Sequence, residues 1–154
     1  MGHWLMKSEP DVFGIDDLAK APRKTTHWDG VRNYQARNFM RDGMRVGDRA
    51  FFYHSNCEEP GIAGLVEIVR AGYPDHTAFD AKDPHFDPDS DPKQPRWFMV
   101  DVRLTRKLAS PITLAALREH SGGALKGLAL LRRGNRLSVM PVSAAHWKFI
   151  LGLE

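Results

Sequence analysis

The feature that most constrains the fold is a long alternation of apolar and polar side chains over residues 96–108. Its period of two residues predicts a long strand with one buried face. A second strand is predicted from Arg49 to His54, where the consecutive aromatic residues Phe51, Phe52 and Tyr53 indicate burial on both faces. Another apolar run, residues 62–73, follows after a short turn. We therefore expect residues 49–73 to form a β-hairpin.

Shorter signals complete a mixed pattern of strands and helices. Strands are predicted at residues 3–7 and 137–142, and helices around Ile15 and Leu18, over residues 33–41 and 113–120, and after Ser143. Residues 22–30 are predicted to be a loop. Because strands and helices do not alternate as in βαβ units, the predicted class is α+β. A small, partly closed mixed β-barrel surrounded by helices would hide the edges of such a sheet.

Length and composition set the broad class. We expect a single domain over residues 1–154, since 154 residues suffice for one ordinary domain and 42% of them are hydrophobic. No apolar run approaches the ~20 residues that span a bilayer, and residues 1–7 lack the features of a signal peptide. The single cysteine, Cys57, excludes an intramolecular disulfide. We expect a monomer without a membrane partner, located in the cytoplasm, or in the nucleus if the source is eukaryotic.

Signatures of common enzymes are missing from the chain. There is no Walker loop, no G-x-S-x-G elbow and no H-E-x-x-H sequence. The seven histidines are scattered, and only His76 and His85, among aspartates, could bind a metal adventitiously. Solvated loop side chains are the interpretation we favour for these two. The sequence therefore predicts no catalytic residue, no metal site and no cofactor.

Charge is distributed unevenly along the chain. The net charge is zero over residues 1–74, −5 over residues 75–92 and +8 over residues 93–154. Most of the basic residues are arginines, which bind phosphates bidentately and stack on bases. A basic final third suggests a polyanionic partner such as nucleic acid, but on charge alone a soluble surface with a high pI is the interpretation we favour.

A polar segment with five prolines occupies residues 74–95. A connection of this length with little periodic structure is unusual in a compact domain and is often functional. Its excess of aspartates leaves open a module that binds other proteins. We regard this alternative as weaker than nucleic-acid binding.

Three further segments combine residues that suit nucleic-acid recognition. Residues 28–38 place a tryptophan before a helix that carries an aromatic ring, guanidinium groups and amides, a set suited to stacking, edge reading and phosphate contact. Residues 130–138 contain three arginines around a Gly-Asn turn. Residues 54–56 offer small polar groups at the end of the aromatic strand. The alternatives are a core tryptophan, arginines held in ion pairs, and simple turn formers.

The chain resembles proteins of the EVE-domain family. The resemblance rests on residues 4–10, 28–38, 51–56, 95–102 and 130–139, which occur in this order and cover nearly the whole chain. It implies a PUA-like fold related to the YTH and ASCH domains. It also implies a pocket for a modified base, lined by Lys7, Ser8, Trp28 and Asp29, with Trp28 as one aromatic wall and Trp97 or Phe98 as a second.

These observations lead to the hypothesis of a reader that takes a modified, flipped or single-stranded nucleobase of DNA or RNA into an aromatic pocket. The predicted pocket residues are Lys7, Ser8, Trp28, Asp29, Asn33, His54, Ser55, Asn56, Trp97 and Phe98, and the predicted phosphate ligands are Arg32, Arg37, Arg132, Arg133 and Arg136. On this hypothesis Trp28→Ala should remove the preference for the modified base and leave the fold intact. The alternative is a small amidohydrolase acting on modified nucleosides, with Lys7 and Glu9 as an acid/base pair.

Overall fold

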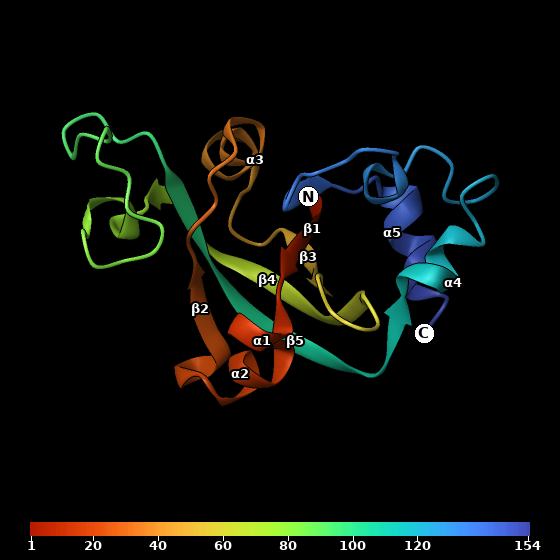
Figure 1. Ribbon diagram of the computed structural model, residues 1–154. Helices are drawn as coiled ribbons and strands as arrows, with labels where there is room; N and C mark the ends of the chain where they lie inside the picture. Colours follow the sequence, from red (N-terminus) through yellow and green to blue (C-terminus); the bar gives the residue numbers. More distant parts are fainter.

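The computed structural model describes all residues 1–154 and has a single six-stranded sheet at its centre (Figure 1). Strands follow in the order β2-β5-β4-β3-β1-β6 across the sheet. Their bounds are β1 His3–Ser8, β2 Thr25–Trp28, β3 Arg49–His54, β4 Gly61–Pro74, β5 Phe98–Thr113 and β6 Val139–Pro141. Strands β1 and β3 are parallel, and all other neighbours are antiparallel. The mixed α+β class is thus confirmed.

Short helices join and cover the strands. They are α1 Pro10–Phe13, α2 Ile15–Lys20, α3 Tyr34–Asn38, α4 Leu114–Arg118 and α5 Ala144–Leu151, with single turns η1 Pro22–Lys24, η3 His76–Phe79 and η4 Ala129–Leu131 and a π-helical turn η2 Phe39–Gly43. The predicted caps are present. Asn33, Thr113 and Ser143 each accept a hydrogen bond from a backbone N–H of the first turn. None of the helices is both long and apolar enough to cross a membrane.

The predicted loop at residues 22–30 is wrong in part, because Thr25–Trp28 forms the edge strand β2 and pairs with β5. This strand has only four residues, and its outer side has no partner in the sheet order. So short a segment shows no alternation that a sequence pattern could detect. The other predicted strands are confirmed, with β5 extending further, to Thr113, and β6 shorter than residues 137–142.

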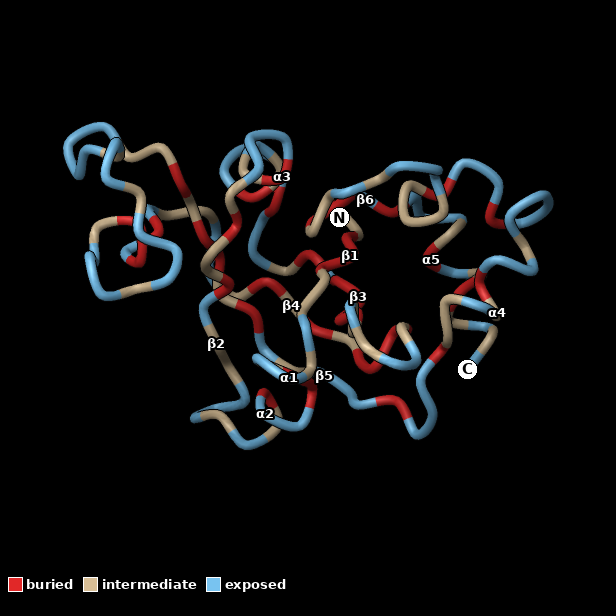
Figure 2. The backbone as a smooth tube through the Cα atoms, in the orientation of Figure 1, coloured by how far each residue is buried: buried red, intermediate tan, exposed pale blue.

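Two apolar clusters pack on opposite faces of the sheet. Figure 2 shows that buried stretches run through the strands at the centre of the sheet, among them β1 and β3. Phe52 points into the cluster with Trp28 and α2, whereas Phe51 and Tyr53 point into the cluster with α4 and α5. All three side chains of this run are buried, as the consecutive aromatic residues predicted. In Figure 1, residues 74–97 lie beside β2 and α3, and α4 and α5 lie at the opposite side of the sheet.

The sheet curls until its two ends approach each other. Residues of β2, at one end of the strand order, line the same cavity as residues of β1 and Ser138, close to the other end. No hydrogen bonds join β2 to β6, so the barrel is closed only in part. The unclosed seam between these two ends is where the cavity lies.

Candidate nucleic-acid interface

A cavity with a volume of about 550 Å³ lies at this seam. Volumes of about 300–1,000 Å³ are usual for small-molecule sites. Four apolar side chains line part of it, Val12, Phe13, Trp28 and Val31. Its polar part is formed by Lys7, Ser8, Glu9, Thr26, His27, Asp29, Gly30, Arg32, His85 and Ser138. This combination of an apolar wall and a few polar groups is suited to a small, partly polar ring.

Lys7 is one of the residues that line the cavity, and its charge has no counterion. Its ammonium group has no carboxylate within 4 Å, and it lies 6.0 Å from the centre of the Tyr53 ring. Burial lowers the pKa of Lys7 because the charged form loses water. An anionic ligand near the ammonium group would stabilise this charge.

Hydrogen-bonding groups of both kinds line the cavity near Lys7. The Ser8 hydroxyl donates to the Phe13 carbonyl at 2.6 Å and keeps its lone pairs for a ligand. Glu9 accepts from the Asn56 amide at 2.6 Å through one carboxylate oxygen. Burial, and then the nearby Asp75 carboxylate, raise the pKa of Asp29. Two carboxylates in the cavity are suitable acceptors for an exocyclic amino group of a base.

Trp28 is the aromatic wall of the cavity, and it is also part of the core. Its side chain is only 7% exposed and packs edge-on against Phe52, with the ring centres 5.4 Å apart. The indole therefore borders the cavity but carries much of the packing between β2 and β3. The expectation that Trp28→Ala leaves the fold intact does not agree with this burial.

Gly30 and His85 close one side of the cavity. The backbone of Gly30 is left-handed, with φ of 77°, and a Cβ there would lie 2.7 Å from the His85 ring. Only glycine allows both the turn and this close approach. His85 belongs to the acidic segment 74–95, so that segment forms a wall of the cavity.

Arg32 does not offer a free guanidinium to a phosphate. Its five N–H groups donate to Val31 O, Asp75 Oδ2, Thr77 Oγ1 and, twice, to His85 O, at 2.8–3.1 Å. An arginine has five such donors, so all of them are used. The role of Arg32 in this structure is to fasten the acidic segment beside the cavity.

Asp75 is the buried partner of this arginine. It accepts hydrogen bonds from the Gly30 N–H, Arg32, and both the N–H and the hydroxyl of Thr77. Burial alone would raise the pKa of Asp75, but these hydrogen bonds, foremost that from Thr77, hold it below its ordinary value. Its contribution to stability is therefore complete at neutral pH and is lost as the pH falls through the folded-state pKa, below about 4.

We expect Asp75→Asn to lower the free energy of unfolding by about 2 kcal/mol, because an amide cannot accept from all four donors. Urea denaturation at pH 7 measures this. Asp91→Ala, in the same segment but exposed, is the control and should change the stability by less than about 0.5 kcal/mol. Equal stabilities of the two variants would contradict the assignment of Asp75 as the anchor of the segment.

The second proposed wall, Trp97 and Phe98, lies outside this cavity. The indole N–H of Trp97 donates to Asp87 at 2.7 Å, and Tyr34 stacks on its ring with a centroid distance of 4.9 Å. Trp97 thereby joins the acidic segment to α3. Arg37 donates to the Arg96 carbonyl at 2.8 Å and lies over the Tyr34 ring, so it too has a structural partner.

Residues 54–56 also lie outside the cavity. The His54 ring accepts from the Ile15 N–H at 3.1 Å, and burial lowers its pKa. The backbone N–H of Ser55 donates to Ser8 O, and the Asn56 amide donates to Glu9. These residues hold α2 and the end of β1 in place, and through Ser8 and Glu9 they fix residues that line the cavity.

A second cavity, of about 270 Å³, adjoins the first. Asn33 and Gln35 line it on one side, and the loop from Arg132 to Leu137 lines it on the other. Arg32 and Asn33, and likewise Leu137 and Ser138, are chain neighbours of which one lines each cavity. The two cavities therefore lie close to each other.

The arginines of this loop are exposed and free. Arg132, Arg133 and Arg136 form no ion pair with a carboxylate and no side-chain hydrogen bond. The loop itself is well defined, because the Asn135 side chain donates to Ala129 O and accepts from the Leu137 N–H. Three guanidinium groups on a defined loop beside a cavity form a basic rim, by which we mean Arg132, Arg133 and Arg136.

Several cavity residues were missed by sequence reasoning. Thr26 and His27 lie on the strand that was predicted as loop, and His85 and Ser138 come from distant parts of the chain. One local signal could have placed His27 beside Asp29: in an extended chain, side chains two residues apart point to the same side. Nothing local predicts the approach of residues 85 and 138.

A curled, partly closed mixed sheet with short helices around it is the arrangement that the resemblance to PUA-like domains implied. The chain belongs to the EVE domain family, which matches residues 2–153. It is 53% identical to thymocyte nuclear protein 1 of Danio rerio (98% of this chain, 71% of the relative) and 50% identical to the human protein (99% and 73%).

Solved structures agree with this assignment. The chain is similar to human THYN1 protein in complex with DNA containing 5-methylcytosine, with a TM-score of 0.95, 49% identity, and coverage of 99% of this chain and 97% of that one. It is also similar to a protein of Pseudomonas syringae, with a TM-score of 0.92, 46% identity and 98% coverage of both chains. The PUA-like fold expected from the sequence is confirmed.

Proposed function

We propose that this protein binds nucleic acid and takes a modified base, of the 5-methylcytosine class, into the cavity at the seam of its barrel. The observation that carries this proposal is an amphipathic cavity with the exposed, unpaired basic rim near it. Human THYN1 protein, which is similar over nearly the whole chain, forms a complex with DNA containing 5-methylcytosine. The bound partner of that relative is the reason for naming this base class.

The chemistry of the cavity fits a methylated cytosine. The carboxylates of Asp29 and Glu9 can accept from its amino group, and Lys7 can donate to its carbonyl or hold a phosphate. Val12, Phe13, Val31 and Trp28 supply apolar surface for the methyl group. Burying one methyl contributes about 0.8 kcal/mol, which corresponds to roughly fourfold tighter binding than the unmethylated base.

The base must leave the helical stack to enter. The cavity is enclosed between β1, β2 and the acidic segment. A base that is paired and stacked in a duplex therefore cannot enter it. Unstacking costs a few kcal/mol, so single-stranded or mismatched sites should bind more tightly than matched duplexes. The basic rim would hold the flanking phosphates.

The proposal is tested with short oligonucleotides that differ only in one base. We expect fluorescence anisotropy at fixed salt to give a several-fold lower Kd for an oligonucleotide with 5-methylcytosine than for the same sequence with cytosine. RNA versions and other modified bases belong in the same series. Identical Kd values for every base would refute base reading, and release of a hydrolysed nucleoside would favour the amidohydrolase instead.

We expect Lys7→Met to weaken binding about tenfold without loss of stability, because the charged form of Lys7 is disfavoured by burial in the free protein. Anisotropy measures the affinity and thermal unfolding the stability. Lys126→Met, at an exposed site away from the cavity, is the matched control and should bind as the wild type does. A Lys7 variant that binds normally would place the ligand elsewhere.

A further inference from the structure

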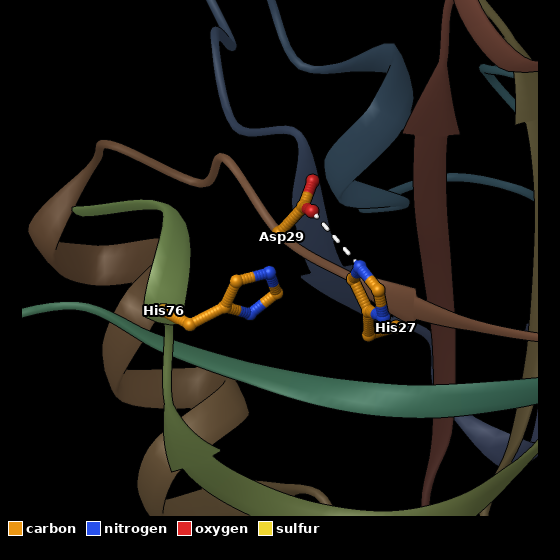
Figure 3. A group of neighbouring side chains, drawn as sticks. All are labelled: His27, Asp29 and His76. Carbon is orange, nitrogen blue, oxygen red and sulfur yellow. Dashed lines mark ion pairs between the residues drawn. The ribbon is translucent and has the colours of Figure 1, made fainter. Parts of the chain in front are cut away.

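Three side chains with metal-binding atoms meet at the outer wall of the cavity (Figure 3). His27 belongs to β2, Asp29 follows two residues later, and His76 begins the turn η3 of the acidic segment. One ligand atom from each lies within 4.8 Å of the others. Residues 27 and 29 share one side of the extended chain, and Figure 3 shows the His76 ring extending toward them.

The contacts inside this group are not those of a hydrogen-bonded ion pair. The His27 Nε2 atom lies 3.3 Å from Asp29 Oδ2, longer than the ~2.8 Å of a charge-assisted hydrogen bond. The His76 ring makes no hydrogen bond and meets His27 edge-on at 5.0 Å. In contrast, a tetrahedral ion with bonds of about 2.0 Å separates its ligands by roughly 3.3 Å. The observed spacing between His27 and Asp29 is that of two ligands of one ion.

We infer that His27, Asp29 and His76 form a binding site for a divalent transition-metal ion of the zinc type. Two imidazoles and one carboxylate are a typical ligand set for zinc, whereas magnesium and calcium prefer oxygen ligands alone. The ligand atoms, which now lie within 4.8 Å of one another, would have to draw together, and His27 and His76 can do so by turning because both side chains are exposed.

Further charged groups surround the three side chains. The carboxylates of Asp75 and Asp83 and the imidazole of His85 all act electrostatically on Asp29. The Arg32 guanidinium is directed at Asp75 and is already saturated.

Two consequences follow from the position of the site. Three protein ligands leave one coordination position open, and since His27 and Asp29 line the cavity, that position is accessible to a water or to an oxygen of a ligand. The ion would also cross-link β2 to η3, and so fasten the acidic segment at a second point besides Arg32 and Asp75. A carboxylate that binds through one oxygen keeps the other for the amino group of a base.

Titration of the untagged, metal-free protein with zinc chloride, without nucleic acid, tests the site. We expect one ion per chain and a rise of about 5 °C in Tm at a hundredfold excess over Kd. Cobalt(II) should give the visible absorption of a tetrahedral site. Nucleic acid is absent from every one of these measurements. A failure to bind zinc would therefore not contradict the proposed function, and a failure to bind nucleic acid would not contradict the metal site.

The variants His27→Gln and His76→Gln should each raise the Kd for zinc at least tenfold. The control is His146→Gln on α5, far from the group in the sequence and outside the cavity, which should bind zinc as the wild type does. Equal affinity in all three variants, or no stoichiometric binding by the wild type, would overturn the inference. Circular dichroism confirms that each variant is folded.

Discussion

Replacing Trp28 by alanine is expected to lower the free energy of unfolding by about 3–5 kcal/mol, the usual cost of removing a buried aromatic side chain. Trp28 is 7% exposed and packs against Phe52. It also belongs to the edge strand β2, which has only β5 as a partner. The loss of the indole therefore weakens both the core and the cavity wall, and Tm should fall by about 10 °C.

Because Trp28→Ala lowers the stability, its preference for the modified base has to be measured at a temperature where the variant is still folded. At a temperature where circular dichroism shows the Trp28→Ala variant folded, we expect it to bind 5-methylcytosine and cytosine oligonucleotides equally. Tyr34→Ala removes an aromatic ring that is 53% exposed and serves as the control, with a stability change of about 1 kcal/mol or less. A Tm of Trp28→Ala within 2 °C of the wild type would contradict the burial of the indole.

The triple change of Arg132, Arg133 and Arg136 to glutamine should weaken binding to every oligonucleotide alike. If each arginine neutralises one phosphate, the slope of log K against log salt becomes less steep by about 2.7, and affinity at 0.15 M salt falls roughly 100-fold. The preference for the modified base should persist, because phosphate contacts carry no base information. Anisotropy titrations at several salt concentrations measure both quantities.

A control with the same change in net charge is available on β5. Arg103, Arg106 and Lys107 are each paired with a carboxylate, Glu67, Glu154 and Asp16 respectively. Their replacement by glutamine should leave the salt slope within about 1 of the wild-type value. If both triple variants lose the same slope, the net charge of the chain governs binding and the basic rim has no special role.

The fold was predictable where the pattern is local and long. The alternation in β5 and the aromatic run of β3 reflect burial on one face and on both faces, and each was predicted from a few consecutive residues. Strand β2 was not predicted, because four residues at an edge carry too little pattern and depend on β5 for their conformation. The curl that brings β2 toward β1 is a property of the whole sheet.

The same distinction between local and long-range determinants applies to the residues of the candidate site. Lys7, Ser8, Trp28 and Asp29, which the family resemblance implied, do line one cavity. Arg32 was expected to bind phosphate, but Asp75, Thr77 and His85 of the acidic segment accept four of its five hydrogen bonds, and Val31 O accepts the fifth. The partner of a charged side chain lies far away in the sequence, so whether an arginine is free cannot be decided locally.

The cavity at the seam draws its walls from nearly the full length of the polypeptide, from Lys7 near the start to Ser138 near the end. Strand β1, which carries Lys7, completes its pairing only when β6 has been synthesised. A nascent chain that stops before that point lacks part of the cavity wall. The cavity is complete only when contacts between residues far apart in the sequence have formed, so a ligand that binds there would stabilise the folded molecule alone.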